Sequence, residues 1–220
     1  MPAPSRRPLL VAIVGGSGAG KSWLAEKLLA ALQPDAARLS LDDFYRDRSR
    51  LSPARRARLN FDHPRAIDWK AFEKCLRACA AGKSCRLPRY DFATHTRRVG
   101  QTVLRPKPVM VVDGLWLWHR PGLRSLFALR IYIECSQPTR LSRRLGRDQR
   151  ARGRDRQSVL RQFRETVEPM HARYVAPQKK WATLRLRGKW GGKEVREVVA
   201  VVRGLLGNEP EVGGPPSSDF

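Results

Sequence analysis

Residues Gly15 to Ser22 read GGSGAGKS, and this stretch decides the fold class. The apolar, β-branched run Leu9–Val14 precedes it, and a helical pattern with leucines on one face follows it. A strand, a glycine-rich turn, a lysine and a helix in this order are typical of a phosphate-binding loop. Glycines let backbone N–H groups point at phosphate oxygens, and the helix adds the positive end of its dipole. The stretch therefore predicts that the chain binds a nucleoside triphosphate.

The residues of this loop have different predicted tasks. Lys21 is expected to reach the outer phosphates, and the hydroxyl of Ser22 is expected to ligate Mg²⁺. The backbone cradle for the phosphates is predicted to consist of Gly15, Gly16, Ser17, Gly18, Ala19, Gly20, Lys21 and Ser22. A chance glycine-rich turn is the alternative, and the strand and helix around the loop argue against it.

Length and hydropathy fit a globular chain. The 220 residues, 41% of them hydrophobic, suffice for one α/β domain with a modest insertion. No stretch approaches the roughly 20 apolar residues that cross a bilayer. The apolar run Leu9–Val14 is too short for a secretory signal and leads directly into the phosphate loop. We therefore expect a cytoplasmic protein without membrane contact.

The chain has four cysteines, whose spacing fits neither a zinc ribbon nor a C-x-x-C redox pair. Cys75 and Cys79 fall one helical turn apart and are expected to pack as small apolar residues. Cys85 and Cys135 are the others. All four are expected to be reduced thiols, with a metal site as the less favoured alternative.

The net charge of +24, from 44 lysines and arginines against 20 acidic residues, favours binding to polyanions. Ten arginines lie between Arg140 and Arg164, where Asp148 and Asp155 are the only acidic residues before Glu165. Such a cluster has two interpretations, either RNA binding or contact with the triphosphate itself. Composition alone does not separate them.

The order of predicted elements gives the architecture. Strands are expected at residues 9–14, 37–41, 109–112, 129–133 and 183–186. Helices are expected near residues 24–32, 69–79, 138–150, 155–174 and 193–206. Strands that alternate with helices predict an α/β fold with a doubly wound parallel sheet. Residues 85–105 alternate loosely and predict a β-hairpin-rich insertion.

Three carboxylates are predicted at the carboxyl ends of strands, where ligands bind in open α/β sheets. Asp113 closes the run VMVVD and is a candidate acid acting on Mg²⁺ or its waters. Asp42 and Asp43 open the motif DDFYR, in which a general base would have aromatic neighbours. A turn or a helix N-cap is the structural alternative for each acid.

The aromatic and histidine residues are ambiguous one at a time. His63 and His95 read equally well as surface histidines with ordinary partners. The aromatic candidates, each of which could belong to the core, are Phe44, Tyr45, Phe61, Tyr90 and Phe92.

Taken together, the motifs resemble those of the uridine kinase (uridine–cytidine kinase) family over roughly residues 9–188. They run in the order GGSGAGKS, DDFYR, LNFDHPRAID, LPRYDFATHTR, VVDG, RLSRRLGRDQRARGRD and VEPMHARYVAPQKKWA. The patterns NFDHP, YDF-x-x-H-x-R and RD-x-x-x-RGR are specific to that family among phosphate-loop kinases.

The resemblance implies a fold of the P-loop NTPase type, with a β-hairpin nucleoside-binding insertion and a helical lid at about residues 138–165. Residues 1–206 would form a single kinase domain, and residues 207–220 a disordered tail. The family implies a homo-oligomer, a tetramer, and nucleic-acid binding becomes the less favoured interpretation.

The resemblance also implies phosphorylation of the 5′-hydroxyl of uridine or cytidine by ATP or GTP with Mg²⁺, as in pyrimidine salvage. Asp42 would be the catalytic base and Asp62 would hold the ribose hydroxyls. Tyr90 and Phe92 would flank the pyrimidine, and His95 would read its 4-substituent. The other implied contacts are Tyr45 and Phe61 closing the pocket, Gln162 and Arg154 approaching the substrate, and Arg144, Arg147 and Arg152 lying in the lid over the phosphates.

The chain departs from the family in ways that bear on selectivity. Asp113 stands where the family has glutamate, and Ala182-Thr183 stands where it has an Ala-Asp pair. Residues 133–139 have fewer acidic residues than usual. A relative acting on another nucleoside, ribosyl compound or sugar phosphate, and an RNA-binding protein with little kinase activity, are the alternative functions.

Overall fold

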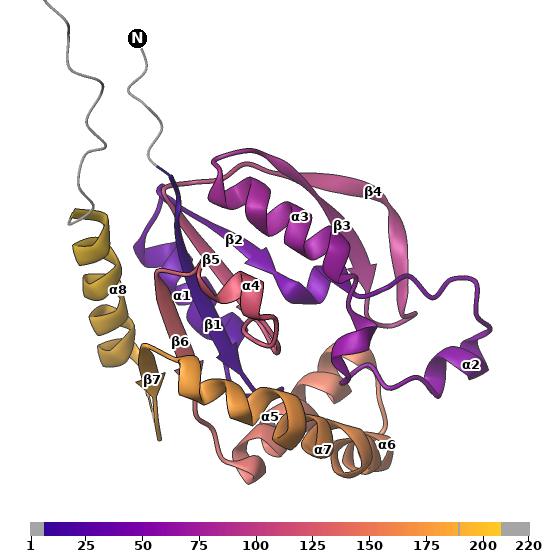
Figure 1. Ribbon diagram of the computed structural model, residues 1–220. Coiled ribbons are helices and arrows are strands. Elements are labelled where there is room, and N and C mark those ends of the chain that lie inside the picture. Colours follow the sequence, from indigo (N-terminus) through magenta and orange to yellow (C-terminus); the bar gives the residue numbers. More distant parts are fainter. Residues whose placement is uncertain (1–6, 189, 208–220) are drawn as a thin grey trace, which may run out of the picture.

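A computed structural model describes residues 7–188 and 190–207. Its central sheet has five strands: β1 (Leu9–Gly15), β2 (Ala36–Ser40), β5 (Val109–Gly114), β6 (Leu129–Ile133) and β7 (Leu184–Leu186). The strands are parallel and lie in the order β2-β5-β1-β6-β7. Their carboxyl ends therefore meet at one edge of the sheet (Figure 1). The predicted doubly wound parallel sheet is confirmed.

Helices cover both faces of the sheet and create two hydrophobic cores. One core contains alternate residues of β1 such as Ala12 and side chains of α3 (Trp69–Ala80). The other contains the intervening residues of β1 and side chains of α1 (Lys21–Ala31) and α8 (Gly192–Gly207). Burial on both faces explains why β1 is apolar throughout, as is typical of central parallel strands.

The connection from α3 into the next strand holds a disulfide between Cys75 and Cys85. The prediction of four reduced thiols is therefore wrong for this pair. The chain turns directly after α3, and this turn brings the two Cα atoms to 5.4 Å, within the distance that a disulfide spans. The side chain of Cys79 is buried as predicted, with its Sγ atom 3.8 Å from that of Cys85.

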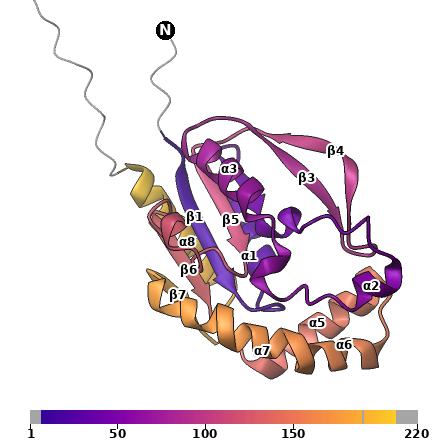
Figure 2. The same cartoon turned by 45° about the vertical axis from the view of Figure 1, so that its right-hand side comes forward.

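The predicted hairpin consists of β3 (Cys85–Asp91) and β4 (Thr96–Leu104), which pair antiparallel outside the main sheet. It lies on the side of α3, away from α8 (Figure 2). Arg97 fastens it to the rest of the chain, because its Nε atom donates to the carbonyl of Tyr45 at 3.0 Å. Its Nη2 atom also pairs with the carboxylate of Asp68 at 3.2 Å.

A layer of helical segments crosses the carboxyl ends of the strands (Figures 1 and 2). It contains α5 (Gln137–Arg152), α6 (Arg156–Gln162) and α7 (Glu168–Met170). The helix expected at 155–174 is interrupted by wide π turns at Phe163–Val167 and His171–Val175, and a 3₁₀ segment extends it to Trp181. Hydrophobic periodicity does not distinguish a π turn from an α-helix, so the sequence does not show these changes.

Shorter elements complete the description. The charged stretch after β2 contains α2 (Pro53–Ala57), and α4 (Pro121–Arg124) precedes β6. Single 3₁₀ turns lie at Leu41–Phe44 and Pro64–Ala66. No helix within 7–188 or 190–207 has the length and apolarity needed to cross a membrane. The predicted disordered tail lies outside the described residues, apart from Gly207, which ends α8.

Candidate active site

The loop between β1 and α1 has a shape that fits phosphate groups. Gly18 and Gly20 have φ angles of 78° and 105°, in the left-handed region that glycine adopts at low cost. A Cβ atom on Gly18 would collide with the carbonyl oxygen of Arg140, so α5 lies directly against this side of the loop. On the other side, Ser17, Gly18 and Gly20 face a cavity.

Lys21 places a cation beside this loop. Its Nζ atom donates to the carbonyl oxygen of Gly16 at 3.0 Å. Burial lowers the pKa of Lys21, while the carboxylates of Asp42 and Asp113 act in the opposite direction. An anion bound in the loop would favour the charged lysine in the same way. The glycine cradle, Lys21 and the hydroxyl of Ser22 together fit a nucleoside triphosphate with its Mg²⁺.

The cavity has a volume of about 260 Å³ and extends from the loop to a cluster of aromatic side chains. Every substrate-binding residue expected from the sequence lines it, although the residues come from six segments of the chain. These residues are Asp42, Tyr45, Phe61, Asp62, Tyr90, Phe92, His95, Arg144, Arg154 and Gln162. Arg147 lines the cavity as well.

Aromatic side chains form the end of the cavity that lies away from the loop. The rings of Phe61 and His95 stack at 3.9 Å, with an angle of 10° between their planes. The ring of Tyr90 lies 5.2 Å from Tyr45 and 5.1 Å from Phe92. His95 has a φ of 55°, in the left-handed region, which is strained for histidine and common at functional sites. These flat apolar surfaces suit a planar ring.

Asp62 is held at the same end of the cavity by contacts from two sides. Its backbone N–H donates to Asn60 Oδ1 at 2.9 Å, and Thr166 Oγ1 donates to its Oδ2 at 3.1 Å. Arg144 Nη1 lies 3.7 Å from its Oδ1. The side chain of Asp62 is 10% exposed. A carboxylate fixed in this way accepts hydrogen bonds from sugar hydroxyls in a defined orientation.

Arg144 spans the two ends of the cavity. One of its nitrogen atoms, Nη1, donates to Ser17 Oγ of the phosphate loop at 2.8 Å. Its Nη2 atom donates to Gln162 Oε1 at 2.9 Å. Arg144 is 5% exposed, so the charge of its guanidinium depends on nearby carboxylates for balance.

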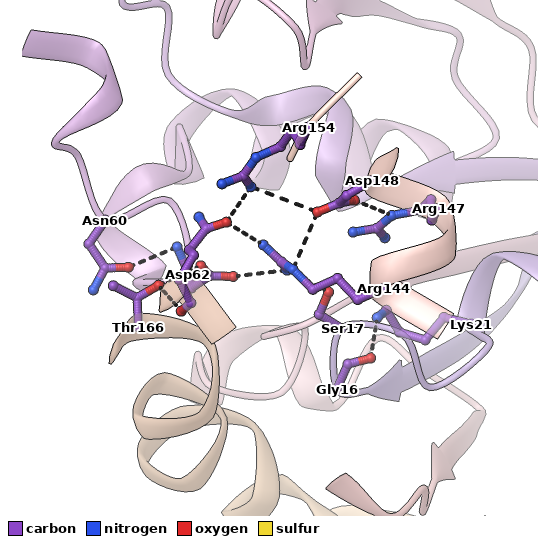
Figure 3. Close-up of polar contacts among 11 residues, drawn as sticks. Gly16, Ser17, Lys21, Asn60, Asp62, Arg144, Arg147, Asp148, Arg154 and Thr166 are labelled. Atoms are coloured by element: carbon purple, nitrogen blue, oxygen red, sulfur yellow. Dashed lines mark hydrogen bonds and ion pairs between the residues drawn. The ribbon is translucent and has the colours of Figure 1, made fainter. Parts of the chain in front are cut away.

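Asp148 balances that charge and holds two further arginines (Figure 3). Its carboxylate is fully buried and accepts from Arg147 Nε at 2.9 Å. It also lies 3.4 Å from Arg144 Nε and 3.8 Å from Arg154 Nη1. Because one anion faces three cations, the arginines are fixed in place without cancelling the positive charge of the site.

The acids after β2 and in β5 have different surroundings. Asp42 lines the cavity, and its backbone N–H donates to Ser40 Oγ. Asp113 is buried, and both of its carboxylate oxygens accept from Arg38, at 2.8 and 3.1 Å. Asp113 does not line the cavity, so a contact with Mg²⁺ would compete with Arg38.

The partly buried carboxyl of Asp43 should make the stability of the folded protein depend on pH. Burial raises the pKa of Asp43 to about 6, and the charge of Asp42 adds to this while Arg38 opposes it. In the unfolded chain this carboxyl ionises near its ordinary value, so above pH 6 the folded state alone bears the cost of a buried charge. We expect Asp43→Asn to raise the free energy of unfolding by about 1–3 kcal/mol at pH 8. The gain should fall to about 0.5 kcal/mol near pH 4, where the folded state is protonated and the unfolded carboxyl is about half ionised.

Urea denaturation at pH 4 and pH 8 measures this difference. Asp47→Asn is the matched control, because hydrogen bonds from Ser49 and Arg97 lower the pKa of Asp47. The folded state therefore favours the ionised form of Asp47, and removing this carboxylate costs stability. Asp47→Asn should be less stable than the parent at pH 8. An Asp43→Asn variant that is less stable than the parent at pH 8 would contradict the argument.

Some predicted site residues lie elsewhere or are not described. Gly15, Gly16 and Ala19 belong to the loop but do not line the cavity. Arg152 ends α5, and its side chain lies outside the described part of the structure.

Asp148 and Thr166 are site residues that the sequence patterns did not predict. Asp148 had one visible signal, since it is one of the few acids in the arginine cluster. Thr166 had no visible signal, because its contact with Asp62 spans 104 residues.

Comparison with known proteins shows the family of the chain. The family model described as "Phosphoribulokinase / Uridine kinase family" matches residues 10–188. A uridine kinase of Clostridium perfringens is 33% identical over 204 residues, covering 92% of this chain and 98% of the relative. A uridine kinase of Chloroflexus aurantiacus is 35% identical over 210 residues, covering 94% and 100%.

Among solved structures, phosphoribulokinase from Rhodobacter spheroides has a similar fold. The TM-score is 0.59 at 15% identity, covering 83% of this chain and 70% of that one. Together with the family match, this fold supports the expectation drawn from the motifs. The chain belongs to the phosphoribulokinase and uridine kinase family and is a kinase of that family.

Proposed function

We propose that this kinase transfers the terminal phosphoryl group of ATP or GTP to the 5′-hydroxyl of uridine or cytidine. The observation that carries the proposal is the single cavity that joins the phosphate loop to an aromatic end containing Asp62. Asp42 lines the cavity, and its charge raises the pKa of Lys21 at the phosphate loop and of Tyr45 at the aromatic end, so it is within electrostatic range of both ends. A hydroxyl bound beside Asp42 would thus face the phosphates.

The residues of the acceptor end favour a nucleoside over a sugar phosphate. The stacked pair Phe61–His95 and the ring of Tyr90 offer apolar faces to a base. Asp62 is an acceptor for ribose hydroxyls, and a second phosphate group beside it would be repelled. Arg144 and Arg154, the cations of this end, are already engaged by Asp148 and Gln162.

Asp42 would accept the proton of the 5′-hydroxyl as the hydroxyl attacks phosphorus. Lys21 and Arg147 would neutralise charge on the phosphoryl group being transferred. The arginines of α5 would exclude water, so that the alcohol is phosphorylated in preference to water. Ser22 would hold Mg²⁺, which would supply positive charge to neutralise the phosphates. The contact of Arg152 with the phosphates and that of Asp113 with the metal stay predictions. A cytoplasmic location and a homo-oligomeric assembly stay predictions as well.

A panel of nucleosides tests the proposal. With Mg²⁺ and ATP or GTP, we expect turnover of uridine and cytidine, and kcat/KM for deoxyuridine lower by about 10²-fold or more. The difference arises because Asp62 would lose a hydroxyl partner in the deoxy compound. Asp62→Asn should raise the KM for uridine. It should also narrow the ratio of the kcat/KM values for uridine and deoxyuridine to about tenfold.

Asp35→Asn is the control for this panel, since Asp35 precedes β2 at the opposite edge of the sheet. Asp35→Asn should leave the ratio of the kcat/KM values for uridine and deoxyuridine unchanged. Tight binding of ATP without turnover of any nucleoside would refute the proposed acceptor and direct the search to other alcohols.

A further inference from the structure

The cavity continues past the phosphate loop to a third group of side chains that the proposed reaction does not use. Trp23 and Arg143 line it there, beyond Ser22. The aromatic end with Asp62 is assigned to the acceptor, and the glycine loop to the phosphates. The nucleoside part of the donor therefore has this remaining end available, next to the start of α1.

Two indole rings meet at this end. Trp190, in the connection between β7 and α8, does not line the cavity itself but lies against Gly20, which does, since a Cβ atom on Gly20 would be 3.1 Å from its ring. The centroids of Trp23 and Trp190 are 5.3 Å apart, with an angle of 71° between the planes. Trp23 is 42% exposed, an unusual exposure for so large an apolar side chain.

Arg143 supplies a cation at the same place. Its Nη1 atom donates to the carbonyl oxygen of Ala19 in the phosphate loop at 3.1 Å. The guanidinium also lies close to Gly20, 3.5 Å from the position of a Cβ atom there. Segments from α1, α5 and the β7–α8 connection thus place two indoles and one guanidinium around the exit of the loop.

From this arrangement we infer that Trp190, supported by Trp23 and Arg143, forms a stacking platform for the purine base of the phosphoryl donor. The inference rests on the proposed function only in taking the loop as the donor site. A flat purine gains apolar burial on an indole and a favourable contact with guanidinium. Because stacking uses the face that all purines share, ATP and GTP should bind with Kd values within about fivefold of each other.

The test is equilibrium binding without any acceptor nucleoside, measured calorimetrically with MgATP, MgGTP and magnesium tripolyphosphate. The parent protein should bind both nucleotides more tightly than tripolyphosphate, which has no base. Trp190→Ala should weaken MgATP binding about tenfold and leave tripolyphosphate binding unchanged. Trp190→Phe keeps an aromatic face and should stay within about threefold of the parent.

Trp181→Phe is the matched control for the loss of an indole. Arg124 covers Trp181 at 3.5 Å, and Trp181 packs against the core on the α3 side of the sheet, whereas Trp190 packs against the core on the α1 side. The affinities of Trp181→Phe for MgATP and MgGTP should equal those of the parent protein. Tryptophan fluorescence gives a second measurement, in which ATP should quench the emission and tripolyphosphate should not. Trp23→Phe and Trp190→Phe should each reduce this quenching.

Two results would overturn the inference. One is unchanged MgATP affinity in Trp190→Ala, and the other is an equal loss for MgATP and tripolyphosphate, which would mean that the indole only supports the loop. Failure of the proposed function would look different, since nucleosides would not be phosphorylated while these donor affinities kept the expected pattern.

Discussion

Asp42→Asn is expected to lower kcat for uridine by about 10³-fold, with the affinity for MgATP nearly unchanged. The amide has almost the same shape as the carboxylate but cannot accept the proton of the attacking hydroxyl. Asp42 lines the cavity between the phosphate loop and the aromatic end. Single-turnover kinetics at saturating uridine, together with calorimetric ATP binding, separate the chemical step from donor binding.

Asp43→Asn is the neighbouring control, because it removes the same charge from the next residue. Its kcat should stay within about threefold of the parent value. An Asp42→Asn variant with kcat within tenfold of the parent would show that another group accepts the proton. An equal loss in both variants would point to the local negative charge as the cause.

Asp148→Asn is expected to cost about 3–5 kcal/mol in free energy of unfolding and to raise the KM for uridine by about 10²-fold. Asp148 is fully buried and faces Arg144, Arg147 and Arg154. Without its charge, the buried guanidinium of Arg144 loses its nearest anion. The arginines would then lose the positions that orient substrate and exclude water.

Denaturant unfolding and steady-state kinetics on the folded variant measure the two effects. Asp155→Asn is the control from the same segment. Asp155 caps α6 by accepting from the backbone of Gln157 and Ser158, and asparagine caps helices about as well. Its stability and KM should match the parent. Normal KM in a stable Asp148→Asn variant would show that the arginines hold their positions without this carboxylate.

Local sequence patterns predicted the sheet and the phosphate loop, because each of these structures depends on residues that are neighbours in the sequence. The run Leu9–Val14 is apolar since β1 is buried on both faces, and the glycines of the loop have conformations that other residues rarely adopt. The family resemblance then predicted the cavity residues. Composition and periodicity alone left Tyr90, Phe92 and His95 ambiguous.

The contacts that depend on tertiary structure could not be predicted. Arg38 pairs with Asp113 across 75 residues, and no local pattern marks that contact. The disulfide between Cys75 and Cys85 depends on how the chain turns between α3 and β3, which spacing does not show. Trp190 and Trp23 come together from opposite ends of the chain, so their meeting at the phosphate loop had no signal in the sequence.

Arg144 has a consequence for how the two substrates affect each other. The same guanidinium donates to Ser17 in the phosphate loop and lies against Asp62 at the other end of the cavity. A ligand that shifts the guanidinium at one end changes the surroundings of the ligand at the other. Binding free energies are then coupled, and thermodynamic linkage requires the coupling to be equal in both directions. The factor by which the donor changes acceptor affinity must equal the factor by which the acceptor changes donor affinity.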